Sequence, residues 1–425
     1  MFDVAGYADK IVSSVPDERV RFLISEVRDN MLAVNKRNDN VGSVHSPEND
    51  KLPVIIRKAM AERMKLENAP IGIWDRQIFA GCFTLRNEKI INSYSLPDFA
   101  FPDEIIEGEK HGFGVYSMFG HISPDYPRML RLGTDGIRNT ILQRLNSVST
   151  DQSRDFLQAA LISLEGLEIF AERHVKLLRE KASVETASDR RAELERAADA
   201  LEHSPKYPAR NFFEAAQAAW LMHLALQLTD NYLALGRPDQ YLYPYLQKDL
   251  MRGSLTMEEA QEITDCFMLK FNERAQDNEV AAREMDLALE ERKEEQKWIE
   301  RKITDIGQQR YNIRDRLDAL NHWNQNVIIG GTIPETGEDA TNLLTCMILE
   351  SFRRIRMTNP VLSVRFHKGS PEYLYRQAAI TLKTGGGLPC IYNDETIVKA
   401  YGNFGIPAEE ARDYANNGCW ECTSR

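Results

Sequence analysis

Three short apolar runs decide the fold: Val327-Ile-Ile-Gly-Gly331, Val361-Leu-Ser-Val-Arg-Phe366 and Pro389-Cys-Ile-Tyr392. Helical patterns follow these runs over residues 340–354, from Ser370-Pro371, and from Asp394 and Pro407. Strand and helix therefore alternate three times, which predicts β/α units joined by right-handed crossovers. The predicted fold class is α/β, with a parallel sheet or barrel whose functional loops follow the carboxyl ends of the strands.

The sequence before this series is mainly helical over residues 1–210. An irregular stretch near residues 91–127, rich in Pro, Gly and aromatic residues, interrupts it, and such long loops usually carry function. Residues 212–228 are too apolar around the whole circumference for a surface helix. Thr256 and Glu259 form a capping box, which predicts a helix that begins at Met257.

Residues 273–322 differ in composition from the rest of the chain. Between Glu273 and Lys302, 17 of 30 residues are charged, with the two signs interleaved. Apolar residues from Ile299 to Leu320 recur at steps of three and four, which predicts a helical hairpin or short coiled coil. We expect either a solvated helical excursion or an arm that docks a partner.

Charge and terminal sequence narrow the function classes. The net charge of -11 and the lack of a basic block argue against nucleic acid or an anionic membrane as the main partner. The first residues lack a basic segment followed by an apolar one, and no run of 18 apolar residues occurs. We therefore expect a cytoplasmic protein that acts on a small molecule or binds a protein partner, with its six widely spaced cysteines reduced.

The last eight residues, Gly418-Cys419-Trp420-Glu421-Cys422-Thr423-Ser424-Arg425, carry the chemistry. A carboxylate raises the pKa of a neighbouring thiol, so Cys419 is a poor thiolate nucleophile, and no histidine flanks it. A neutral thiyl radical that abstracts hydrogen, with Glu421 moving protons on the same substrate, suits the pair better. The spacing of Cys419 and Cys422 also allows a redox dithiol or half a metal site, but no second such motif completes a zinc site.

Eight segments, in order, resemble the glycyl radical enzymes of the pyruvate formate-lyase type. They are Gly120-His-Ile-Ser-Pro-Asp-Tyr126, Phe213-Glu-Ala-Ala-Gln217, Leu235-Gly-Arg-Pro-Asp-Gln-Tyr-Leu-Tyr-Pro-Tyr245, Gly253-Ser-Leu-Thr-Met-Glu-Glu-Ala260, Asn326-Val-Ile-Ile-Gly-Gly331, Pro360-Val-Leu-Ser-Val-Arg365, Gly387-Leu-Pro-Cys-Ile-Tyr-Asn-Asp394 and Asn417-Gly-Cys-Trp-Glu421. The G-R-x-D-Q-Y-x-Y-P-Y and N-G-C-x-E elements are the specific ones. The resemblance extends from about residue 120 almost to the last residue.

The resemblance implies a barrel made of two half-barrels of β/α units. Residues 211–272 and 323–425 would form the first half-barrel after the helical residues 1–210, with the excursion 273–322 inserted. A finger loop at the barrel centre carries the thiyl cysteine in this family, and Cys419 takes that place. The C-terminal glycyl radical domain, with its R-V-x-G-Y-like motif, is absent from the 425 residues. We expect an N-terminal portion or one subunit of a split enzyme.

The resemblance also implies a radical cofactor and protein partners. In the family, an activase that uses S-adenosylmethionine and an iron–sulfur cluster installs a glycyl radical, which converts the cysteine to a thiyl. The radical glycine would lie on a C-terminal half or companion chain, and this chain would bind no cofactor of its own. A homodimer and anaerobic chemistry are expected.

Glu421 matches the carboxylate of the lyase, dehydratase and decarboxylase branches, whereas pyruvate formate-lyase has adjacent cysteines. The leading hypothesis is a dehydratase or other eliminase that acts on a small polar substrate of the diol, hydroxy acid or amino acid type. One alternative is a radical decarboxylase of an aryl-acetate-like substrate. Another is an inactive or regulatory half-chain that needs a partner carrying the radical glycine.

Further substrate-binding residues are expected at His121, Asp125, Asn231 and Trp420. His121 and Asp125 lie in the irregular loop that borders the substrate in the family, where His121 is either a pocket residue or an anchor of the loop. Asn231 occupies a position where relatives place a polar pocket residue, and the alternative is a cap at a helix end. Trp420 replaces a small aliphatic residue of the family, and its ring either reshapes the pocket or packs behind the loop. Arg237 and Asp239 are expected to form a structural ion pair or hydrogen-bond node, and His223 to be a core histidine.

Overall fold

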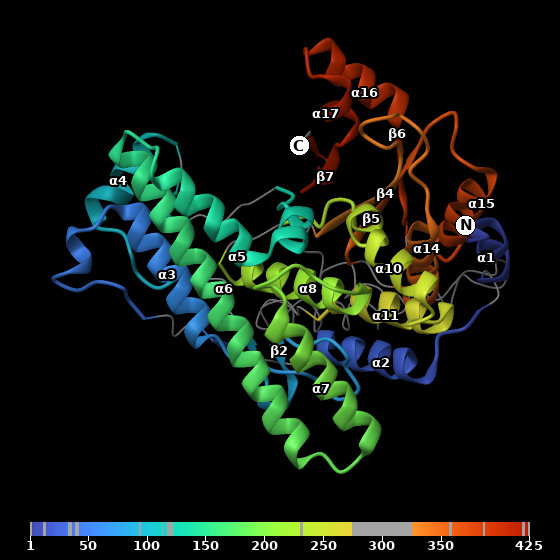
Figure 1. Cartoon of the computed structure of the whole chain (residues 1–425), viewed down its shortest axis with the longest axis horizontal. Coiled ribbons are helices and arrows are strands. Elements are labelled where there is room, and N and C mark those ends of the chain that lie inside the picture. The colour runs from blue at the N-terminus through green and yellow to red at the C-terminus, as the bar shows by residue number, and fades with distance from the viewer. Residues whose placement is uncertain are drawn as a thin grey trace, which may run out of the picture.

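The computed structural model describes residues 2–11, 14–32, 36–38, 42–92, 95–112, 114–116, 122–229, 233–273, 325–356, 359–385, 387–418 and 421–423. Helices make up most of this part of the chain (Figure 1). The strands of its larger parallel sheet, β4 to β6, lie in the last quarter of the sequence. The fold class is α/β, as predicted. The predicted charged excursion lies outside the described residues except for Glu273.

The first half of the chain is built from helices around a small sheet. The helices are α1 Val4–Ile11, α2 Glu18–Leu32, α3 Val54–Asn68, α4 Pro102–Lys110, α5 Tyr126–Leu145, α6 Asp151–Val184 and α7 Ser188–His203. Strand β3 (Ile90–Asn92) lies between β1 (Lys36–Asn38), which runs parallel to it, and β2 (Thr84–Leu85), which runs antiparallel. The long helix α6 packs against both α3 and α7 (Figure 1).

Helix α4 corrects the expectation of an irregular stretch over residues 91–127. Pro102 occupies its first turn, and the side chain of Glu104 accepts a hydrogen bond from the backbone N–H of Phe101 at 2.8 Å. Only Gly108 of this nine-residue helix is buried. The helix therefore leaves no apolar stripe in the sequence by which its period could be recognised.

Helix α8 (Phe212–Thr229) runs through the middle of the molecule (Figure 1). Along the chain, it stands between the helices α1 to α7 and the part that contains the parallel sheet. Nearly all of its residues are buried, as the apolar sequence predicted. It is followed by α9 (Pro238–Tyr241), α10 (Tyr243–Arg252) and α11 (Met257–Lys270). The capping box at Thr256 and Glu259 is confirmed, because each side chain bonds the backbone N–H of the other residue.

The three predicted strands form a parallel sheet in the order β4-β5-β6: Asn326–Gly330, Val361–Phe366 and Cys390–Asn393. Helices α14 (Leu343–Ile355), α15 (Glu372–Leu382), α16 (Asp394–Asn403) and α17 (Ala408–Arg412) follow the strands, as the alternating pattern predicted. Strands β4 and β5 are buried along their whole length. Gly236 forms a further parallel bridge to Val327, so residues 234–236 extend this sheet beside β4.

The chain ends in an antiparallel hairpin of β7 (Ala415–Asn417) and β8 (Glu421–Thr423). The hairpin contacts β4, so it lies against the parallel sheet rather than at the surface of the helical region. The sequence predicted a loop at this point but not the two strands.

Candidate active site

The β7–β8 hairpin carries the predicted catalytic residues. Asn417 pairs with Glu421, Asn416 with Cys422 and Ala415 with Thr423, which leaves residues 418–420 as the connection. Gly418 has a φ of 48°, in the left-handed region that favours glycine. Cys419 and Trp420 lie outside the described residues, and Glu421 is exposed at the start of β8.

The pairing assigns the side chains of the hairpin to two faces. Residues directly opposite each other in antiparallel strands point to the same face, and successive pairs alternate. Asn417 and Glu421 therefore share a face with Ala415 and Thr423. Cys422 points to the other face, together with Asn416.

The face that carries Cys422 is a small apolar cluster rather than a reactive site. Cys422 is partly buried against a cluster that includes Ile328 and Tyr414, and burial raises the pKa of its thiol. This surrounding is that of a core-filling cysteine.

Backbone and side-chain hydrogen bonds bring together the segments that adjoin the predicted site residues. The Ala234 N–H donates to the Ile122 carbonyl at 2.9 Å, and the Leu235 N–H donates to the Asn326 carbonyl at 2.8 Å. The amide of Asn326 in turn donates to the carbonyl of Gly418 at 3.2 Å. Loop 122–125, segment 233–236 and the hairpin thus meet at the start of β4.

Two predicted site residues lie close in sequence to the segments that meet here. His121 directly precedes Ile122, and Asn231 lies three residues before Ala234. Both lie outside the described residues, as do Cys419 and Trp420. Their roles remain predictions, and the contacts above concern only the described residues beside them.

Asn417 ties the hairpin to the loop. Its Oδ1 accepts a hydrogen bond from the Ser123 hydroxyl at 2.8 Å, and its Nδ2 donates to Oγ1 of Thr423. Asn417 itself is fully buried. One side chain therefore joins β7, β8 and the loop that follows His121.

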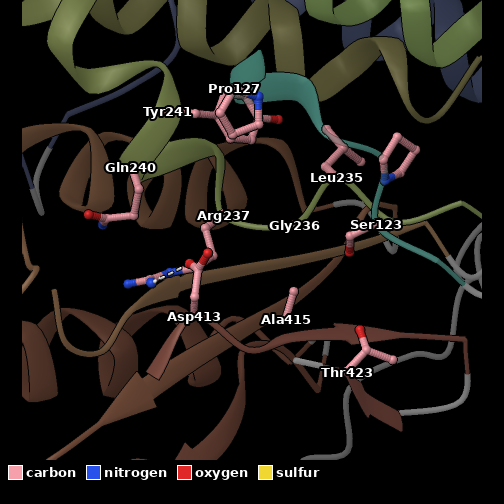
Figure 2. Close-up of a pocket in the computed structure, with 11 residues that line it drawn as sticks. Ser123, Pro127, Leu235, Gly236, Arg237, Gln240, Tyr241, Asp413, Ala415 and Thr423 are labelled. Carbon is pink, nitrogen blue, oxygen red and sulfur yellow. Dashed lines mark hydrogen bonds and ion pairs between the residues drawn. The ribbon is translucent and has the colours of Figure 1, made fainter. Parts of the chain in front are cut away.

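A cavity of about 260 Å³ is lined on the hairpin side by Ala415 and Thr423, which share a face with Glu421, but Glu421 itself is not among the lining residues (Figure 2). Figure 2 shows Ser123 pointing toward Ala415 and Thr423 across the opening. Its lining also includes Gly236, Arg237, Gln240, Tyr241 and Asp413. Most of its polar groups are uncharged or acidic, so it is suited to small molecules that carry hydroxyl or amino groups.

Arg237 is structural and does not pair directly with Asp239. Its guanidinium donates to the carbonyls of Gly330 and Thr332 at 3.1 and 2.9 Å and pairs with Asp413 at 3.2 Å. Asp239 is fully buried and accepts from the Gly330 N–H and the Thr345 hydroxyl at 2.8 and 2.7 Å, while burial raises its pKa. The predicted node is confirmed, with Asp413 as the ionic partner of Arg237.

A second buried ion pair supports the base of the hairpin. Nε and Nη2 of Arg365 each donate to a carboxylate oxygen of Asp394 at 2.8 Å, and Nη1 donates to the carbonyl of Tyr414 at 3.0 Å. The Tyr414 hydroxyl donates to Asp394 at 2.7 Å, and the guanidinium lies 3.9 Å from the centre of the Tyr414 ring. A Cβ at Gly331 would lie 2.4 Å from Nε of Arg365, so only glycine leaves room for this pair.

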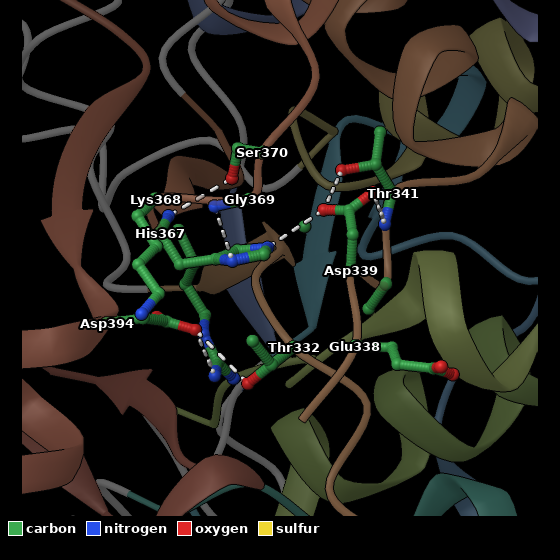
Figure 3. A network of polar contacts seen from close by, with 12 residues as sticks. Thr332, Glu338, Asp339, Thr341, His367, Lys368, Gly369, Ser370 and Asp394 are labelled. Carbon is green, nitrogen blue, oxygen red and sulfur yellow. Dashed lines mark hydrogen bonds and ion pairs between the residues drawn. The ribbon is translucent and has the colours of Figure 1, made fainter. Parts of the chain in front are cut away.

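The neighbouring edge of the sheet is closed by further polar contacts (Figure 3). Nε2 of His367 lies 3.0 Å from Asp339, and Nδ1 accepts from the Gly369 N–H at 3.1 Å. The Gly369 bond leaves the hydrogen of the neutral ring on Nε2, where it donates to Asp339. Both ring nitrogens are engaged, so we assign His367 a structural role.

Two other predicted residues have visible structural partners. Asp125 is the N-cap of α5 and accepts from the Arg128 N–H at 3.1 Å. His223 is buried between the Tyr126 hydroxyl and Oε1 of Gln325, each at 2.8 Å. The expectation of a core histidine with satisfied nitrogens is confirmed, and contact of Asp125 with substrate remains a prediction.

Sequence reasoning missed Ser123, Thr423 and the role of Asn417. All three lie within or beside the motifs already quoted, but a hydroxyl or an amide carries no periodic signal. The ion pair was also missed, although Arg365 and Asp394 each end a quoted motif.

The part of the chain that the structure describes contains neither a cluster of metal-ligating side chains nor a helix that could span a membrane. No three His, Cys, Asp or Glu side chains there, a set that excludes Cys419, come together as metal ligands. None of the helices described is long and apolar enough to cross a bilayer.

The sequence pattern of the family described as "Pyruvate formate lyase-like" matches residues 87–424. The isethionate sulfite-lyase of Oleidesulfovibrio alaskensis is 33% identical over 306 residues, which are 70% of this chain and 33% of that protein. A solved structure titled for 1,2-propanediol dehydration in Roseburia inulinivorans has a TM-score of 0.74 and 25% identity, and the match covers 96% of this chain and 55% of that one.

The B12-independent glycerol dehydratase of Clostridium butyricum shares the fold, with a TM-score of 0.74 at 24% identity over 97% of this chain and 55% of that chain. In each comparison the matched region is well under two thirds of the relative. The known proteins are therefore longer than the part to which this chain corresponds.

Proposed function

Because the chain belongs to the pyruvate formate lyase-like family, we propose that it supplies the thiyl cysteine and the proton-transferring carboxylate of a glycyl radical lyase. The observation that carries the proposal is the convergence of loop 122–125, segment 233–236 and the β7–β8 hairpin beside a polar cavity. Cys419 and Glu421 belong to that hairpin, and Glu421 shares its face with two residues that line the cavity.

The proposed cofactor is a glycyl radical on a glycine outside these 425 residues, installed by an activase. When that radical is present, it converts the Cys419 thiol to a thiyl. The thiyl then takes a hydrogen atom from a substrate carbon, so that a C–H bond breaks and an S–H bond forms.

Glu421 would accept the proton of a hydroxyl group on the radical carbon. Deprotonation makes it easier to expel a leaving group from the neighbouring carbon, because the developing carbonyl delocalises the charge. Cys419 would then return its hydrogen atom to the product radical, which regenerates the thiyl. When the leaving group is a hydroxyl, Glu421 would give it the accepted proton so that water leaves, whereas sulfite would leave as an anion and the proton on Glu421 would pass to solvent.

The cavity supports a small polar substrate over an aryl acetate. Ser123, Gln240, Asp413 and Thr423 contribute polar side chains to it, and Tyr241 is the one aromatic residue among its described lining. We therefore propose elimination from a diol, hydroxy acid or amino acid type of compound, with aryl-acetate decarboxylation as the alternative.

The test is anaerobic activation of the full-length protein, or of the chain with a companion that carries the radical glycine, by the cognate activase and S-adenosylmethionine. The glycyl doublet in electron paramagnetic resonance is followed together with product from glycerol, 1,2-propanediol, isethionate and indoleacetate. Carbonyl product from a hydroxylated compound supports the lyase, and decarboxylation of indoleacetate supports the alternative. A radical without turnover of any compound, or no radical at all, favours an inactive or regulatory half-chain.

A further inference from the structure

Asn417 sets the hydrogen-bond polarity of two hydroxyl groups in the cavity wall. The Ser123 hydroxyl donates to Oδ1 of Asn417, and Nδ2 of Asn417 donates to Oγ1 of Thr423. An amide has a fixed acceptor end and a fixed donor end, so the two hydroxyls are held in opposite senses.

The consequence is a complementary pair of groups. Ser123 uses its hydrogen on Asn417, which leaves the lone pairs of its oxygen as acceptors. Thr423 uses a lone pair on Asn417, which leaves its hydroxyl hydrogen as a donor. Both residues line the cavity on the face of the hairpin that carries Glu421.

We propose that Ser123 and Thr423 form a subsite for one substrate hydroxyl group, with Asn417 as the residue that positions and polarises them. A bound hydroxyl donates its hydrogen to Ser123 and accepts the hydrogen of Thr423. This inference rests on the proposed function in that the cavity holds the substrate, and it names the residues that select a hydroxylated one.

The hairpin register supports the assignment. Asn417 and Thr423 lie on one face and are diagonal neighbours, so their side chains meet without distortion. Ser123 is held against them because the carbonyl of the preceding residue, Ile122, accepts from the Ala234 N–H. The two hydroxyls therefore come from separate segments that are both fixed by other contacts.

The experiment measures binding to the full-length protein without activation, so that no radical is needed. Ligand-observed nuclear magnetic resonance titrations compare 1,2-propanediol with 1-chloropropane, which has a carbon chain of the same length and no hydroxyl group. The wild-type protein should bind the diol about fivefold to tenfold more tightly, the worth of one or two hydrogen bonds. Equal affinities would overturn the proposal.

Variants locate the effect. Thr423→Val and Ser123→Ala should each reduce the ratio of diol affinity to chloropropane affinity about fivefold, while Thr423→Ser should keep it. Thr336→Val, at an exposed residue that is not part of the cavity lining, is the matched control. A ratio unchanged in Thr423→Val and Ser123→Ala would overturn the subsite.

Asn417→Asp separates polarity from simple structural support. Aspartate has no donor end, so Thr423 would turn its hydrogen toward the carboxylate and lose it as a donor to the ligand. The new carboxylate lies opposite Glu421 and also loosens the hairpin, but loosening weakens both probes, so the ratio isolates the polarity. A ratio retained in Asn417→Asp would contradict the positioning role.

The two proposals fail in distinguishable ways. Selective diol binding without any turnover after activation would refute the radical lyase and leave the subsite standing. Turnover in a protein whose diol selectivity does not depend on Ser123 and Thr423 would refute the subsite alone.

Discussion

Helix α6 has 34 residues and is held by apolar packing along its length, whereas each strand of the β7–β8 hairpin has three residues and is held by polar side chains. The buried residues of α6 include Leu167, Phe170 and Leu178, which join the main core. The hairpin depends instead on Asn417, Asn326 and the pair of Arg365 with Asp394.

This difference explains how so short a hairpin can hold its side chains in a defined position. Apolar contacts are non-directional, so a core tolerates small shifts of its residues. Hydrogen bonds have narrow geometry, so a strand held by several of them has one register. We therefore expect changes in the helical region to lower stability and changes below the hairpin to lower turnover as well.

The largest effect should come from Asp394→Ala, because Arg365 would be left as an unpaired buried charge. Breaking such a pair typically costs about 3–5 kcal/mol, and the Tyr414 hydroxyl also loses its acceptor. Urea unfolding should show this loss, and turnover should fall further than the folded fraction does. Glu409→Ala, at an exposed carboxylate of α17, is the control.

A second variant sharpens this prediction. Replacing both residues, Arg365→Met with Asp394→Leu, removes both charges and should recover most of the stability. If turnover recovered as well, the pair would not be needed to place the hairpin.

Leu178→Ala tests whether a change in helix α6 lowers stability without lowering turnover. Leu178 is fully buried on α6, and such truncations cost about 2–5 kcal/mol. The midpoint of thermal unfolding should fall, while turnover per folded molecule stays at the wild-type value. Lys176→Ala, at an exposed position of the same helix, should change neither quantity. Lost turnover in correctly folded Leu178→Ala would contradict the separation of the two regions.

The sequence alone predicts the elements that apolar packing holds better than it predicts the hairpin. Strands β4 and β5 and helix α8 were predicted because burial makes their residues apolar, β6 because of a short apolar run, and helix α11 because the exposed pair of Thr256 and Glu259 caps its first turn. The hairpin strands, Ala-Asn-Asn and Glu-Cys-Thr, have no such period, because side-chain hydrogen bonds to distant segments stabilise them. Family resemblance identified Cys419 and Glu421, but only the structure relates Ser123 to Asn417.

Lys270 and Glu273 form a buried ion pair at the end of helix α11, in a part of the molecule that is otherwise packed mainly by apolar side chains. Lys270 Nζ lies 2.7 Å from the Glu273 carboxylate, and burial raises the pKa of Glu273 to about 7 from an ordinary 4.5. The folded state then binds more protons than the unfolded state between about pH 4.5 and 7. The free energy of unfolding should therefore fall as pH rises through this range, by an amount on the order of 3 kcal/mol, and level off above it.

Urea titrations at pH 5, 6, 7 and 8 check this dependence. Glu273→Gln should make the slope between pH 5 and 7 shallower without abolishing it, since burial also raises the pKa of Asp265 to about 7. A slope identical to that of the wild type would show that Glu273 does not titrate in this range.

The smallest effect is expected from Thr150→Ala at the start of α6. The Thr150 hydroxyl accepts from the Ser153 N–H at 3.2 Å, and loss of such a cap costs about 1 kcal/mol. Thermal unfolding should show the shift, turnover should be unchanged, and Thr150→Ser should restore stability. An effect on turnover would mean that α6 influences the hairpin from a distance.

The most direct test of the central claim compares Cys419→Ala with Cys422→Ala in the activated full-length protein. Turnover of the hydroxylated substrate and the glycyl doublet are measured in the same samples. We predict that Cys419→Ala abolishes turnover with the doublet intact, while Cys422→Ala, on the opposite face of the hairpin, keeps both. Turnover retained in Cys419→Ala, or lost in a well-folded Cys422→Ala, would contradict the account.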